Sequence, residues 1–92
     1  MSAGNELEGS WDVHRTGGLL PPMRGVVRKR IENGRGWTIA AGVRIPFEVD
    51  GPSLRYPLGR LVDELAPDGL DAYAGTTKLF GRTLGTFRLT RA

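Results

Sequence analysis

The segment GSWDVHR, residues 9–15, is the first stretch with the pattern of a strand, and the segment GGLLPP, residues 17–22, follows it. In the first segment apolar and polar side chains alternate, so that Trp11, Val13 and Arg15 share one face of an expected strand. In the second, two glycines and two prolines within six residues cannot continue a sheet ladder, and we expect the strand to stop there. The chain therefore opens on a half-buried strand, and the surroundings of Trp11 determine what kind of sheet it joins.

The same alternation recurs along the rest of the chain. Seven further strands are expected, over residues 25–32, 36–41, 43–49, 54–58, 60–65, 70–79 and 82–91. The segment RLVDEL, residues 60–65, also fits one helical turn, and we favour the strand. The 14 glycines and 6 prolines are scattered between apolar runs, which favours short strands and tight turns over helices.

Two local signals set expectations for individual strands. Asn33-Gly34 is a strong hairpin signal, because a type I′ turn needs positive φ at both central positions. The sequence NGRG around it predicts a loop longer than two residues. Pro46 interrupts the most regular alternation in the chain, which indicates an edge strand or a bulge at that position.

These strands predict an all-β fold, a small antiparallel up-and-down β-barrel of about eight short strands. An open meander of this length leaves two exposed edges, and closure into a barrel removes both. A two-layer β-sandwich needs a similar strand pattern and is the alternative. A chain of 92 residues fits one domain. We expect residues 1–6 to form a flexible tail and residues 7–92 a single β-barrel domain.

The composition excludes several classes of protein. The chain has no cysteine, which rules out a disulfide scaffold, a thiolate nucleophile and a cysteine-based metal site. The opening MSAGNELEGS has neither the basic start nor the apolar centre of a signal peptide. No apolar stretch approaches the roughly 20 residues that span a bilayer. We therefore expect a soluble, cytoplasmic protein with no membrane partner.

The basic residues raise the question of a nucleic-acid partner. The net charge is +3, and arginine supplies all the basic residues except Lys29 and Lys78. Phosphate contacts and a stacked base would require Arg24, Arg28, Lys29, Arg30, Arg35 and Trp37. A basic run on a strand also serves as a solvated face that discourages edge pairing. The modest net charge favours this second interpretation, so nucleic acid is not the expected partner.

No cluster of side chains predicts a reaction. His14 is the only histidine, so a multi-histidine metal site is excluded, and we expect neither a metal nor a cofactor. Asp63 and Glu64 are adjacent on an expected strand, where neighbouring side chains point to opposite faces and cannot both line one cavity. Neither a phosphate-binding glycine loop nor a nucleophile elbow occurs. We therefore do not expect an enzyme.

The opening EGSWDV resembles the first strand of the lipocalin and fatty acid-binding protein superfamily, the calycins, whose members begin with a Gly-x-Trp motif. Gly9 and Trp11 match that motif. The resemblance implies that Trp11 lies across the closed end of a barrel and that an arginine of the final strand, Arg88 or Arg91, packs over its ring. Such a contact gains about 0.5–2 kcal/mol. The chain is shorter than typical members, so the resemblance implies a minimal lipocalin-like barrel.

A barrel of this kind leads us to expect a small apolar or amphipathic ligand in its interior. Tyr56 and Tyr73 would orient a polar group, and Arg28 or Arg30, if inward, would hold a carboxylate. The expected ligand-binding residues are Val27, Arg28, Arg30, Ile39, Phe47, Tyr56, Tyr73 and Phe87, with Leu79 beside them. The same side chains could instead fill the interior as a core. The chain would then be a structural or protein-interaction module, either a monomer or a homodimer.

Overall fold

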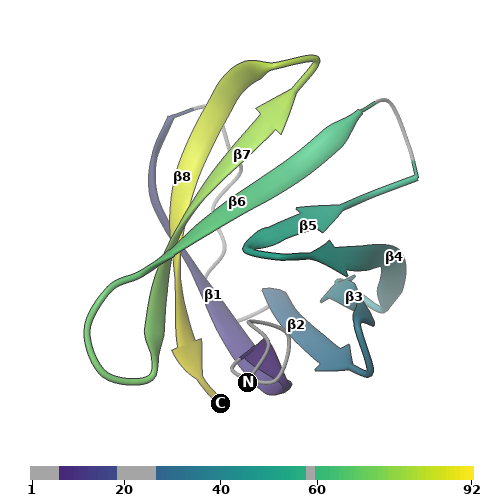
Figure 1. Cartoon of the computed structure of the whole chain (residues 1–92), viewed down its shortest axis with the longest axis vertical. Coiled ribbons are helices and arrows are strands. Elements are labelled where there is room, and N and C mark those ends of the chain that lie inside the picture. Colours follow the sequence, from purple (N-terminus) through teal and green to yellow (C-terminus); the bar gives the residue numbers. More distant parts are fainter. Residues whose placement is uncertain (1–6, 19–26, 58–59) are drawn as a thin grey trace.

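The computed structural model describes residues 7–18, 27–57 and 60–92, and these form a closed antiparallel barrel. The eight strands pair in chain order, and the last pairs with the first (Figure 1). They are β1 (Gly9–Gly18), β2 (Val27–Glu32), β3 (Arg35–Ala40), β4 (Val43–Asp50), β5 (Ser53–Arg55), β6 (Leu61–Pro67), β7 (Ala72–Leu79) and β8 (Arg82–Arg91). The predicted barrel is confirmed and the sandwich is excluded. The segment RLVDEL is a strand, and none of the described residues forms a helix long and apolar enough to cross a membrane.

The Asn33-Gly34 turn is tighter than the sequence predicted. Glu32 pairs with Arg35, which leaves a two-residue loop, and the φ angles of Asn33 and Gly34 are 52° and 78°. Both positive values are those of a type I′ turn, whose twist matches that of the flanking strands. The same arrangement joins β3 to β4 at Ala41-Gly42 and β7 to β8 at Phe80-Gly81. The prediction of a longer loop was therefore wrong, because Arg35 and Gly36 belong to the next strand.

The strand β1 also runs further than expected. It continues through Gly17 and Gly18, with a bulge between Arg15 and Gly17, and remains paired with β8. A Cβ on Gly18 would lie 2.5 Å from the Cα of Gly85, so only glycine allows the two strands to approach there. The glycines that were expected to end the strand instead permit its close approach to β8. Residues 19–26, which include the LLPP part of this segment, lie outside the described part of the chain.

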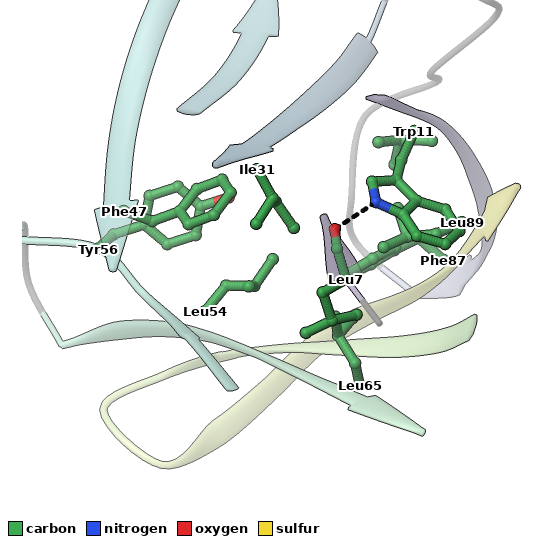
Figure 2. Packing of buried hydrophobic residues seen from close by; sticks show 10 residues of the cluster. Leu7, Trp11, Ile31, Phe47, Leu54, Tyr56, Leu65, Phe87 and Leu89 are labelled. Atoms are coloured by element: carbon green, nitrogen blue, oxygen red, sulfur yellow. Dashed lines mark hydrogen bonds between the residues drawn. The ribbon is translucent and has the colours of Figure 1, made fainter. Parts of the chain in front are cut away.

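The buried apolar core fills one end of the barrel, where β1 begins and β8 ends. Figure 2 shows the rings of Phe47 and Tyr56 on one side of this core and Trp11 on the other. The core comprises Leu7, Trp11, Val13, Ile31, Phe47, Leu54, Tyr56, Leu65, Phe87 and Leu89. Glycine makes room for two of the rings. A Cβ on Gly75 would lie 2.2 Å from Phe87, and one on Gly36 would lie 3.0 Å from Phe47 and only 2.0 Å from the Arg30 carbonyl oxygen.

Candidate ligand-binding site

The closed end of the barrel is held by the Gly-x-Trp segment and the last strand. Trp11 is fully buried, and its Nε1 donates a hydrogen bond to the Leu7 carbonyl at 2.8 Å (Figure 2). The Arg91 guanidinium lies 4.0 Å from the centre of the indole and also donates to the Glu8 carbonyl. Gly9 has a φ of 117°, and a Cβ there would lie 2.8 Å from Arg91 Nη1. These contacts join β1 to β8 and block this end to a ligand.

Two sequence-predicted residues take different places at this end. Arg88 points outward, and its Nε lies 3.1 Å from Asp68 Oδ2, so Arg91 alone packs over the indole. Tyr73 was expected to line the ligand site. It packs edge-on against Trp11 instead, with ring centroids 5.4 Å apart, and so belongs to the closed end.

The other half of the barrel interior contains a cavity of about 320 Å³. Its outer walls are apolar and half-buried, and they come from four different strands: Val27, Ile45, Leu61 and Leu84. Below them lie Val13, Lys29, Thr38, Tyr56, Asp63, Thr77 and Phe87. The strand register explains these two levels, because Lys29 opposes Thr38 and Asp63 opposes Thr77, one step nearer the closed end than Val27 and Leu61. The cavity therefore has apolar walls and a polar floor.

The centre of this floor is a buried ion pair. Lys29 Nζ lies 3.0 Å from Asp63 Oδ2, and each side chain is only 4% exposed. Burial lowers the pKa of Lys29 from its ordinary value, and the charge and hydrogen bond of Asp63 oppose that shift. An uncompensated charge in such a place would be very costly, so each of the two residues requires the other.

Three hydroxyl groups complete the floor. Lys29 Nζ donates to Thr38 Oγ1 and to the Tyr56 hydroxyl, each at 2.7 Å. Asp63 accepts from Tyr56 at 3.0 Å and from Thr77 at 2.8 Å. Burial and the neighbouring Asp63 charge raise the pKa of Tyr56 well above its ordinary value. We name these five residues, Lys29, Thr38, Tyr56, Asp63 and Thr77, the polar cluster.

Three aromatic rings surround the lysine. Lys29 Nζ lies 5.5 Å from the ring centroids of Phe47 and Phe87 and 5.4 Å from that of Tyr56. At these distances the faces of the rings attract a cation. They also separate the ammonium from bulk water, so that the hydrogen bonds within the cluster act in a region of low dielectric constant.

The structure brings some of the predicted ligand-binding residues together. Val27, Tyr56 and Phe87 all line the cavity. Phe47 lies beneath it, with its ring 5.4 Å from that of Tyr56, and belongs to the core. Leu79 is half-buried and does not line the cavity.

Three predicted residues point away from the interior. Arg28 and Arg30 are exposed on the outer face of β2, where they pair with Asp12 and Glu32. Neither can hold a ligand in the barrel. Ile39 pairs with Arg28 across the sheet and shares that outer face, so it does not line the cavity either.

The phase of two strands explains these corrections. Alternation on β2 turns Val27, Lys29 and Ile31 inward, so the middle member of the basic run is the buried one. On β3 the inward residues are Gly36 and Thr38 rather than the larger Trp37 and Ile39. Sequence reasoning therefore missed Lys29 and Thr38. The signal for Lys29 was its place midway between Val27 and Ile31, two apolar residues in the same alternation phase.

Asp63 and Thr77 were missed for a different reason. Asp63 lies between two apolar residues of the same face, Leu61 and Leu65. Its neighbour Glu64 is turned to solvent. The expectation that Asp63 and Glu64 face opposite sides is confirmed. The polar side chain of Asp63 at an inward position was a signal that could have been used. Its partner Lys29 on β2 could not be identified without knowing how the strands pair.

The basic run does not form a continuous surface. Lys29 is buried, while Arg28 and Arg30 each have an acidic partner on the outer face. Arg35 is exposed at the start of β3, and Arg24 lies outside the described residues. Within the described ranges, no group of three or more histidine, cysteine or acidic residues is arranged to hold a metal ion.

A second, larger recess of about 770 Å³ runs along β3, β4 and the residues after β5. Residues 43–47 of β4 have no pairing with β5, which is why Pro46 is accommodated in mid-strand. The recess is bordered by the exposed charges of Arg35, Glu48 and Arg55. It lacks the buried ion pair of the interior cavity, which we therefore take as the candidate site.

Comparison of the chain with models of protein families, with curated proteins and with solved structures found no match.

Proposed function

We propose that this protein is a small lipocalin-like binding protein that holds a small apolar or amphipathic molecule inside its barrel. The observation that carries this proposal is the cavity between the filled closed end and the opposite end of the barrel, with apolar walls and a buried polar floor. Ligand sites typically combine mostly apolar walls with a few placed polar groups. A volume of about 320 Å³ suits a ligand at the small end of that range.

The arrangement at the closed end supports a calycin relationship. Gly9 and Trp11 reproduce the motif of the first strand, and Arg91 of the last strand covers the indole. The closed eight-stranded barrel is compatible with a minimal member of that superfamily. The filled end of the interior would stabilise the fold, and the hollow end would bind the ligand.

The composition of the cavity floor also favours binding over packing. Replacing a buried ion pair with apolar side chains of similar volume is often neutral or stabilising. A barrel interior that served only as a core would therefore not need the ion pair of Lys29 and Asp63 for its stability. Charged groups in a desolvated cavity are more often found at functional sites.

Filling the cavity tests the proposal. Val27→Phe places extra atoms in the wall of the cavity, whereas Val62→Phe makes the same change at a half-buried residue of β6 that does not line it. Binding of 1-octanol would be followed by calorimetry on folded protein. We expect the wild type and Val62→Phe to bind and Val27→Phe to lose affinity at least about tenfold. A folded Val27→Phe that binds like the wild type would refute interior binding, and Leu84→Phe repeats the test from another wall.

A further inference from the structure

The polar cluster has a complete set of internal hydrogen bonds. It contains six polar hydrogens, three on the Lys29 ammonium and one on each of its three hydroxyl groups. The structure contains six hydrogen bonds among its members. No buried side-chain nitrogen or oxygen in the described residues is left without a partner.

Each hydrogen can be assigned to one bond. Lys29 donates to Thr38, Tyr56 and Asp63, which uses its three hydrogens. The Tyr56 hydroxyl donates to Asp63, so in its contact with Thr38 the threonine must be the donor. Thr77 donates to the other oxygen of Asp63. If the proton in the Lys29–Asp63 hydrogen bond moves to Asp63, the cluster still has six polar hydrogens for its six hydrogen bonds.

The cluster therefore has no hydrogen left to donate to a ligand, but some of its oxygen atoms can still accept a hydrogen bond. Asp63 Oδ1 receives one hydrogen bond, from Thr77, and a carboxylate oxygen can accept another. The Thr77 hydroxyl oxygen keeps its own lone pairs. The other side chains of the cavity are apolar, and they supply no donor: Val13, Val27, Ile45, Leu61, Leu84 and Phe87.

We infer that the cavity takes neutral ligands that donate a hydrogen bond, such as alcohols, and rejects carboxylates, even though a lysine lies in its floor. This inference rests on the proposed function. A carboxylate would be desolvated without gaining a donor, and it would find no net positive charge, because Asp63 already neutralises Lys29, so its burial is strongly unfavourable. An alcohol could donate to Asp63 or Thr77 while its chain contacts the apolar walls.

A series of matched ligands tests the inference on the wild-type protein. The probes are 1-octanol, its isomer 1-methoxyheptane, which cannot donate a hydrogen bond, and octanoate, all titrated by calorimetry at neutral pH. We expect 1-octanol to bind about threefold to tenfold more tightly than the ether. We expect octanoate to bind more weakly than either. An ether equal to the alcohol, or octanoate equal to it, would overturn the inference and leave interior binding intact, whereas no binding by any of the three would overturn the proposed function as well.

A substitution that adds donors should reverse the preference. Asp63→Asn introduces two amide hydrogens and removes the negative charge beside Lys29. We expect octanoate affinity to rise about tenfold or more in this variant. Glu64→Gln is the matched control, because it makes the same change at the exposed neighbour, which pairs with Lys78, and it should leave octanoate binding unchanged. A folded Asp63→Asn with unchanged octanoate affinity would overturn the inference, and if the variant does not fold, the wild-type ligand series decides.

Discussion

The single residue with most influence on this site is Lys29. It is the middle member of a basic run, and the alternation of β2 turns it alone into the barrel, where Asp63 neutralises it. Removing one partner of a buried pair leaves the other charge without compensation, whereas removing both leaves an apolar site. The two kinds of change should therefore have very different effects on stability.

We expect Lys29→Met to lower the free energy of unfolding by about 3–5 kcal/mol. The double variant Lys29→Met/Asp63→Leu should recover more than half of that loss, because no unpaired charge remains. Urea unfolding of the wild type, both single variants and the double variant gives the coupling between the two residues. A loss below about 1 kcal/mol in Lys29→Met would contradict the buried pair, since that is the range of an exposed one.

The raised pKa of Tyr56 makes stability depend on pH. The ordinary tyrosine pKa is 10.0, so above about pH 10 the unfolded chain loses a proton that folded Tyr56 keeps. The free energy of unfolding must then fall as the pH rises. Lys29 acts in the opposite sense, because its lowered pKa makes stability rise with pH below its ordinary value of 10.5.

Tyr56→Phe separates the two effects. The variant keeps Lys29 and lacks the tyrosine proton, so we expect its stability to fall less steeply than that of the wild type above about pH 10. The largest difference in slope is about 1.4 kcal/mol per pH unit. Urea unfolding of both proteins at alkaline pH measures it. Parallel pH profiles would show that Tyr56 ionises normally in the folded state.

At the level of the strands, closure depends on the seam between β1 and β8. Trp11 is fully buried beneath Arg91, whereas the second tryptophan, Trp37, lies half-buried on the outer face of β3 with Arg44 5.7 Å from its ring. Replacing each tryptophan with alanine therefore compares how much stability comes from closing the barrel and how much from packing on its surface.

We expect Trp11→Ala to lower the free energy of unfolding by about 3–5 kcal/mol, as for other large-to-small changes in a core. Trp37→Ala should cost clearly less, because its ring is already partly in water. Thermal or urea unfolding of the two variants gives the comparison. Equal losses would show that Trp11 has no special part in closing the barrel.

The sequence predicted the strands well because apolar alternation is local. It placed Phe47 and Phe87 inward correctly, and it identified the Trp11 contact with Arg91 as one of two candidates. It failed on β3, where Ile39 was expected to line the interior and lies on the outer face instead. A Cβ on Gly36 would lie 2.0 Å from the Arg30 carbonyl oxygen and 3.0 Å from the Phe47 ring, so this inward position requires glycine, and alternation then turns Trp37 and Ile39 outward.

The site was harder to predict than the fold, because its residues meet only through the register. Lys29 and Asp63 are 34 positions apart and come from strands on different sides of the barrel. The alternation along each strand indicated that each residue could face inward. No feature of the neighbouring sequence indicated that the two side chains would meet. The expected strands 70–79 and 82–91 left the two-residue connection Phe80-Gly81 that the structure has, whereas the turn at Ala41-Gly42 was missed because Ala41 was assigned to the strand before it.

For the molecule as a whole, we claim that the hollow part of the barrel interior binds a ligand. The most direct test is native mass spectrometry of protein purified without denaturation. We expect a discrete non-covalent excess of about a few hundred daltons, the size of ligand that small-molecule pockets hold. It should disappear when the protein is unfolded and be absent from Val27→Phe. A bare mass for the wild type, unchanged after incubation with 1-octanol, would contradict the claim and leave the barrel a structural module.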